Sequence, residues 1–160
     1  MEGKFDAVFL DYAYCQTLKG MPDKVKVPLV TLEYEDCIAA MITEETYWWE
    51  KKSGGITWSY PAGWARNGPE GLVKLFKLDS MMDQGYEPVF FMKMMFAGFN
   101  KALFIDTGAG NIPASERKSK ELACLLCMNH ERRTGSLQAI REAVERTKEL
   151  AKSRAAKEMY

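Results

Sequence analysis

Short apolar runs bounded by polar residues, glycine or proline indicate β-strands along the chain. Four segments have this pattern: residues 5–11, 54–60, 87–92 and 102–106. Each is rich in β-branched or aromatic residues and is shorter than an ordinary helix. We therefore expect four strands, and residues 25–30 could form a further short extended segment.

Longer segments with apolar residues three or four positions apart predict helices. These are residues 31–41, residues 69–85, which open on a proline, and the segment from 113 to 160. Thr31 is the expected cap of the first helix. Ser136 is the expected cap of the last helix, after a break at the preceding Thr-Gly pair.

Strands that alternate with helices predict the α/β class. We expect a single domain over residues 1–160, with a mostly parallel sheet covered by helices on both faces. The C-terminal segment, residues 113–160, is expected to be helical. A length of 160 residues suits one such domain.

Composition and charge set only loose bounds on function. Hydrophobic residues make up 47% of the chain and charged residues 28%, as in an ordinary globular protein. The net charge is zero, yet residues 116–160 carry 11 basic and 7 acidic side chains, which permits an acidic or phosphate-bearing partner. We find neither a signal-peptide pattern nor a membrane-spanning apolar run, so we expect a soluble cytoplasmic protein without membrane association.

The first predicted strand brings an acid and two aromatic rings to its C-terminal end. The residues that follow Leu10 are Asp11, Tyr12, Ala13 and Tyr14. In open α/β sheets, ligands bind in the crevice beyond the carboxyl ends of the strands. Asp11 is therefore expected at the mouth of a pocket.

This strand end resembles the Asp-Pro-Pro-Tyr or Asp-Pro-Pro-Trp motif of the permuted adenine-N6 methyltransferases. Asp11 and Tyr14 stand at the acid and aromatic positions, and both prolines are replaced. Further segments are similar, in the same order, to those of the branch that includes the messenger-RNA adenosine methyltransferases. They are Thr31-Leu32-Glu33 at a helix start, Ile56-Thr57-Trp58 at a strand end, and residues 85–93. The resemblance covers about residues 5–105.

The resemblance implies a function in methyl transfer to nucleic acid. Asp11 would orient the target amine, and Tyr14 would stack on the flipped-out base. The methyl donor would be S-adenosylmethionine. Because both prolines of the motif are absent, an inactive, degenerate descendant is the other outcome that the resemblance allows.

A second acidic strand end is similar to the element that holds S-adenosylmethionine in that family. Gly108 and Gly110 would let the backbone approach the cofactor, and Asp106 could accept hydrogen bonds from its ribose hydroxyls. A tight strand-to-helix turn without a ligand explains the same residues. The remaining chain is also too short to complete a seven-stranded sheet.

The pair Cys124 and Cys127, with His130 beyond it, allows a metal-site interpretation. Leucines surround the pair in a helical pattern, so we expect both thiols to pack in the core and expect no metal site. His130 is the only histidine, and an exposed or helix-ending position is expected for it.

Aromatic residues are concentrated between positions 47 and 64. Three of them, Trp58, Tyr60 and Trp64, together with Tyr12, are candidates for contacts with a substrate or partner. A hairpin or loop lid that closes over the core is the alternative interpretation of this segment.

A different class of function also fits the chain. It could be a small non-catalytic interaction protein that binds a macromolecular partner, either a protein or a nucleic acid. The aromatic segment or the C-terminal helices would provide the surface. The apolar positions from Leu137 to Ala151 suit a partner helix or a homodimer.

Overall fold

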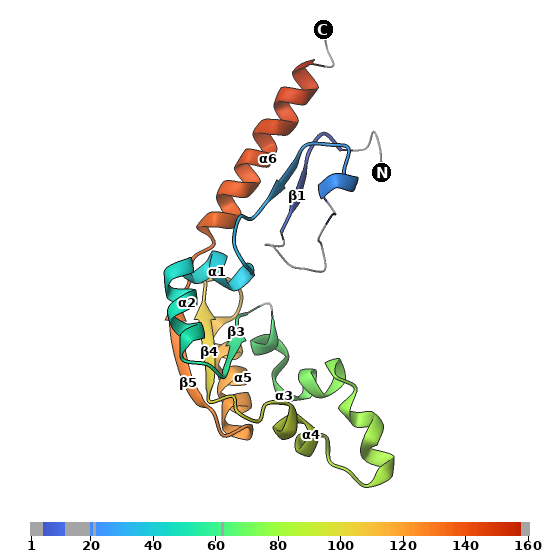
Figure 1. Cartoon of the computed structure of the whole chain (residues 1–160), viewed down its shortest axis with the longest axis vertical. Coiled ribbons are helices and arrows are strands. Elements are labelled where there is room, and N and C mark those ends of the chain that lie inside the picture. Colours follow the sequence, from blue (N-terminus) through green and yellow to red (C-terminus); the bar gives the residue numbers. More distant parts are fainter. Residues whose placement is uncertain (1–4, 12–19, 21, 62, 158–160) are drawn as a thin grey trace. The chain divides into compact units, whose positions relative to one another are not determined.

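The computed structural model describes residues 5–11, 20, 22–61 and 63–157 (Figure 1). The chain divides into two compact units. The first unit combines residues 1–44 with residues 136–160, and the second comprises residues 45–135.

The first unit is built on two parallel strands and a long helix. Strands β1 (Val8–Leu10) and β2 (Leu29–Thr31) pair in parallel, with Val8 opposite Leu29. The short 3₁₀ helix η2 (Pro22–Lys24) lies between them in the sequence. Helix α6 (Gln138–Lys157) packs against both strands, and helix α1 (Cys37–Ile42) also contacts it.

One apolar cluster joins the strands of the first unit to α6. Among the described residues it contains Val30, Leu32, Ala40 and Ala143, with Phe9 and Ile140 packed against them, and α1 buries further side chains. Ala143 is fully buried, so the close approach of α6 to β2 depends on a small side chain at this position. This unit therefore rests on residues from both ends of the chain.

The second unit contains a three-stranded parallel sheet in the order β3-β4-β5. Its strands are β3 (Ile56–Ser59), β4 (Lys101–Asp106) and β5 (Asn129–Thr134). The central strand, β4, has four consecutive residues at 0% exposure, Ala102 to Ile105. A strand buried on both faces requires apolar residues at successive positions rather than at alternate ones.

Helices cover both faces of this sheet. Helices α3 (Trp64–Leu75), α4 (Pro88–Met95) and α5 (Ile112–Leu125) contribute to the core on the Ala102 face. On the opposite face, Tyr47 of helix α2 (Glu44–Lys52) stacks on Trp58 of β3, with ring centroids 5.5 Å apart. The 3₁₀ helix η3 (Leu78–Gln84) connects α3 to α4. This arrangement confirms the predicted α/β class with parallel strands and helices.

Helix α3 consists of two pieces. Gly68 has φ 62°, which interrupts the helix, and Pro69 begins the second piece as the sequence predicts. A Cβ atom on Gly68 would lie 2.8 Å from Cδ of Lys118 on α5. Glycine at this position therefore permits both the backbone bend and the close packing of α3 on α5.

Three predicted elements were wrong, and the helix predicted over residues 69–85 is broken at Lys77, which has φ 54° and precedes η3. In the segment predicted as a strand over residues 87–92, Glu87 precedes helix α4 and residues 88–92 lie within it, because Met92 and Phe96 bury one helical face. The helix predicted from Thr31 begins only at Cys37. Asp36 caps it by accepting hydrogen bonds from the amides of Ile38 and Ala39, at 2.8 and 3.0 Å.

The third error concerns the C-terminal segment 113–160, which is not helical throughout. Strand β5 interrupts it, and the sequence of this strand is Asn-His-Glu-Arg-Arg-Thr. A strand without any apolar residue gives no signal to an analysis of hydrophobic periodicity. Its place in the sheet depends on backbone pairing with β4 and on the ion pairs described below.

Truncation of Leu103 tests the central strand. The side chain is fully buried, so Leu103→Ala should lower the free energy of unfolding by about 2–5 kcal/mol. Leu75→Ala removes the same atoms from a residue that is 61% exposed, so it should change the free energy of unfolding by less than about 0.5 kcal/mol. Urea unfolding measures both, and equal losses would contradict the described core.

Candidate functional site

The carboxyl ends of β3, β4 and β5 meet at one edge of the sheet because the three strands are parallel. Asp106 is the last residue of the central strand, and its side chain is 17% exposed. Five residues, 107–111, connect it to helix α5. This strand-loop-helix unit is the candidate functional site, because ligands of open α/β sheets bind at such an edge.

The loop after Asp106 is shaped by two glycines in the left-handed region. Gly108 has φ 73° and Gly110 has φ 79°. The amide of Gly108 donates a hydrogen bond of 2.8 Å to Oδ1 of Asp106. Among the described residues, no atom beyond its chain neighbours lies within 4 Å of the position that a Cβ atom of Gly108 would occupy, so the backbone there is open on one side.

The loop that follows β3 lies beside this glycine loop. A Cβ atom on Gly110 would lie 3.7 Å from Cβ of Pro61. Helix α5 then begins with Asn111 as its cap, whose Oδ1 accepts a 3.1 Å hydrogen bond from the amide of Ala114. The edge thus combines two loops with the start of a helix of 14 residues.

A row of charges links β4, β5 and α5 at the same place. Arg132 of β5 donates hydrogen bonds to Oδ2 of Asp106 and, at 3.0 Å, to Oε2 of Glu116. Lys120 in turn lies 2.9 Å from Oε1 of Glu116. The Arg132 side chain is 49% exposed, so its guanidinium is held by two carboxylates while part of it faces solvent.

These contacts keep both acids ionised. The backbone hydrogen bond from Gly108 and the guanidinium of Arg132 hold the pKa of Asp106 below its usual value. The hydrogen bond from Lys120 lowers the pKa of Glu116 in the same way. At neutral pH the row carries two negative and two positive charges.

His130 continues this row along β5. Its ring lies 6.4 Å from the Phe104 ring, in a stacked orientation, and its Nε2 lies 3.2 Å from Oγ of Ser119. Burial lowers the pKa of His130 below 6.5. The ring is therefore neutral at pH 7, and its half-buried place on a strand differs from the expected exposed or helix-ending position.

The predicted cofactor residues Asp106, Gly108 and Gly110 are thus brought together, and Tyr60 directly follows β3 at the same edge. Trp58 points to the other face of the sheet, where its ring stacks on Tyr47. Trp64 is the first residue of α3. The aromatic segment is a helix followed by a strand, so the predicted hairpin or loop lid was wrong.

The predicted catalytic residues belong to the first unit. Asp11 directly follows β1 and is exposed, and partial desolvation raises its pKa above 3.8. Tyr12 and Tyr14 lie outside the described residues. A pocket of about 290 Å³ in this unit has other walls: Leu32, Glu33, Tyr34, Glu44, Ala139, Glu142 and Arg146. The roles of Asp11 and Tyr14 therefore stay predictions.

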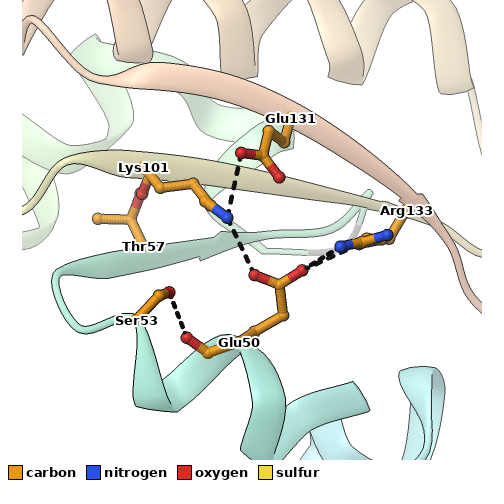
Figure 2. Close-up of polar contacts among 6 residues, drawn as sticks. All are labelled: Glu50, Ser53, Thr57, Lys101, Glu131 and Arg133. Carbon is orange, nitrogen blue, oxygen red and sulfur yellow. Dashed lines mark hydrogen bonds and ion pairs between the residues drawn. The ribbon is translucent and has the colours of Figure 1, made fainter.

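A second charged cluster lies on the opposite face of the sheet (Figure 2). Glu50 of α2 has 0% exposure, and its Oε1 accepts hydrogen bonds from Nε and Nη2 of Arg133 at 2.9 and 2.7 Å. Its Oε2 accepts from Nζ of Lys101 at 3.0 Å, and Lys101 also pairs with Glu131 at 3.1 Å. Both carboxylate oxygens are engaged in a closed site, so this cluster fastens α2 to the sheet.

The electrostatic balance at Glu50 favours its charged form. Burial alone would raise its pKa, but the hydrogen bonds from Arg133 and Lys101 outweigh it and hold the pKa below 4.5. Arg133 also lies over the ring of Trp49, 5.5 Å from its centroid. The exposed indole of Trp49 thus shields one side of the ion pair from water.

The sequence analysis missed Arg132 and Glu116 as site residues, because β5 was expected to be helical. In the correct register, His130, Arg132 and Thr134 share one face of β5 while Glu131 and Arg133 share the other. Side chains that alternate between the two faces of this polar strand are the sequence signal that could have identified these site residues.

Cys124 and Cys127 also differ from expectation, since both are exposed. The buried face of α5 is formed instead by Ser115, Ser119, Leu122 and Ala123. In the described part of the chain, no group of three or more His, Cys, Asp or Glu residues is placed to hold a metal ion. Among the described residues there is also no helix with the length and apolarity needed to cross a membrane.

Comparison with known proteins gives a family but no activity. A family described as "Protein of unknown function (DUF1638)" matches residues 1–144. The chain belongs to the DUF1638 family. The match covers the N-terminal segment of the first unit and the whole second unit of this DUF1638 protein, and it ends within α6. No curated protein and no solved structure matches the chain significantly.

Substitution of Glu50 tests the closed cluster of this DUF1638 protein. Glu50→Gln removes the carboxylate that Arg133 and Lys101 share and leaves Lys101 with Glu131, so it should lower the free energy of unfolding by about 2–4 kcal/mol at neutral pH. This expected loss is smaller than the largest losses caused by breaking a buried ion pair, because the Arg133 side chain is 41% exposed and can be hydrated. Glu45→Gln on the same helix is the control, since Glu45 is exposed.

The same cluster predicts a dependence on pH. Because the pKa of Glu50 is lowered on folding, its stabilisation is present above pH 4.5 and is lost as the pH falls through the folded-state pKa. Between about pH 7 and about pH 4, the free energy of unfolding measured with urea should fall less for Glu50→Gln than for the wild type. Equal losses in both proteins would contradict this assignment.

Proposed function

We propose that this DUF1638 protein is methyltransferase-like and binds S-adenosylmethionine at the carboxyl edge of the β3-β4-β5 sheet. The observation that supports the proposal is the position of Asp106. It ends the central strand of a parallel sheet and is followed by two left-handed glycines and a helix. This order of elements is common where α/β sheets bind nucleotide-like cofactors.

The residues at this edge fit an adenosyl group. Asp106 is ionised, and each of its oxygens accepts one bond within the described residues, so further lone pairs can accept from ribose hydroxyls. The open side of Gly108 offers the backbone approach that such a ligand needs. Arg132 uses two of its donors on Asp106 and Glu116, and its exposed part could bind the carboxylate of the methionine moiety.

The methyl-transfer part of the proposal rests on the resemblance at Asp11 and Tyr14. S-adenosylmethionine would supply the methyl group, Asp11 would accept hydrogen bonds from the target amine, and Tyr14 would stack on the base. The substrate class would then be an adenine of nucleic acid, modified inside the cell. A degenerate member of the family would retain cofactor binding without transfer.

Asp106→Asn tests the cofactor site. Asparagine keeps the shape and can still accept from Gly108, but it lacks the charge, so the dissociation constant for S-adenosylmethionine should rise at least about tenfold. Isothermal titration calorimetry measures this change. Asp79→Asn, at an exposed acid in η3 of the same unit, should leave binding unchanged.

Thermal melting provides the independent readout. Saturation of the wild type at about 100 times the dissociation constant should add about 2.7 kcal/mol of stability. Parallel melts with AMP and ATP separate an adenosyl site from a general nucleotide site. No binding of S-adenosylmethionine by the folded wild type at about millimolar concentration would contradict the proposal.

A second candidate function is a non-catalytic interaction protein, which a group of exposed apolar side chains favours. Seven large apolar side chains between residues 75 and 99 are at least 38% exposed: Leu75, Met82, Tyr86, Phe90, Met94, Met95 and Phe99. We name these seven residues the Met-Phe surface. Methionine-rich surfaces adapt to partners, and apolar patches on a monomer often mark interfaces.

A double substitution tests self-association through the Met-Phe surface. Charges of both signs flank it, such as Lys93 and Glu87, which suits a self-complementary contact with a second copy. Phe90→Ser with Met94→Ser should convert a dimer to a monomer in size-exclusion chromatography with light scattering. Leu150→Ser on α6, where the side chain is 40% exposed, is the control. A wild type that is monomeric at every concentration would contradict self-association.

A further inference from the structure

Two cysteines end helix α5 in a tight turn. Cys124 lies in the last turn, and Cys127 lies two residues beyond the helix end. The amide of Met128 donates to the carbonyl of Ala123 at 2.8 Å, and that of Cys127 to the carbonyl of Cys124 at 3.2 Å. This pair of bonds is the Schellman motif, with Cys127 at the position where glycine is preferred.

The backbone at Cys127 is unfavourable for a residue with a side chain. Its φ is 57°, in the left-handed region that glycine adopts without strain. Burial does not explain the cysteine either, because the side chain is exposed. A reactive side chain at a position with this backbone cost is a candidate for a chemical use.

The turn also sets the distance between the two residues. A carbonyl-to-amide bond across three residues brings the two Cα atoms within about 7 Å. Disulfides need a Cα separation of about 4.4–6.8 Å. Both thiols are exposed, so a small reagent can reach either one.

We propose that Cys124 and Cys127 form a dithiol–disulfide site that exchanges with low-molecular-weight disulfides. The thiolate of one cysteine attacks a sulfur of glutathione disulfide, the glutathione bond breaks, and the first glutathione leaves with the proton from that cysteine. The second cysteine loses its proton and attacks the mixed disulfide, and the second glutathione leaves with that proton. Two protein thiols are oxidised, and one glutathione disulfide is reduced to two thiols.

A metal site explains the pair less well. Structural zinc sites use four ligands, and the described residues offer no group of three possible ligands. The dithiol site is also separate from the edge that holds Asp106, because the turn precedes β5 and therefore lies at the amino ends of the strands.

The experiment uses the full chain with Cys15→Ser and Cys37→Ser, so that only the proposed pair remains. After incubation with glutathione disulfide and alkylation of free thiols, intact mass spectrometry should show the loss of two hydrogens. Peptide mapping should place the bond between Cys124 and Cys127. With Cys127→Ser added, the intermediate cannot resolve, and a persistent glutathione adduct on Cys124 is expected.

Cys127→Gly is the matched variant that separates chemistry from folding. Glycine suits the left-handed turn, so this variant should melt at least as high as the reduced parent while it loses the disulfide. Adducts on both cysteines without a bond between them would overturn the proposal. Stoichiometric zinc binding that is lost in Cys127→Gly, with no disulfide in the parent, would also overturn it.

Discussion

The buried carboxylate of Glu50 is the constraint on which the second unit depends. A charge with 0% exposure is tolerated only when its oxygens are fully engaged, and Lys101 and Arg133 supply the donors from two neighbouring strands. The donors must reach one point from β4 and β5, so their positions fix the register of these strands relative to α2. Hydrophobic packing alone would allow α2 to slide along the face of the sheet, whereas a set of directed charged bonds permits one placement.

Strand β5 carries this constraint to the other side of the sheet. Arg133 points to Glu50, and the adjacent Arg132 points to Asp106 and Glu116. Because side chains alternate along a strand, the same six residues bind α2 on one face and arrange the candidate site on the other. Both clusters consist of the same kinds of groups, but the central acid of the first, Glu50, is fully buried, whereas Asp106 and Glu116 of the second keep 17% of their side-chain surface exposed.

The sequence predicted most of the buried framework. Strands β3 and β4, the start of a helical piece at Pro69, and the cap of the last helix at Ser136 follow from apolar runs and from residues with local backbone preferences. The predictions failed where tertiary contacts decide. The apolar run at residues 88–92 suits a strand or a helix equally, and Met92 with Phe96 settles it only through burial in the core. Asp106, Gly108 and Gly110 were identifiable because a strand end and glycines mark them. Arg132 was not identifiable, because it reaches Asp106 only when β5 is paired with β4.

The first unit consists of two segments of chain, and the whole second unit lies between them in the sequence. Its core joins Val30 and Leu32 near one end of the chain to Ala143 near the other. During synthesis the second unit can therefore complete its contacts as soon as its last strand has left the ribosome, while β1 and β2 must wait for α6. The closure of this long loop has an entropic cost that the contacts within the first unit must offset. Until α6 is made, β1 and β2 would expose the apolar side chains that pack against it, such as Phe9 and Val30, so assembly of the first unit is the step most open to chaperone assistance.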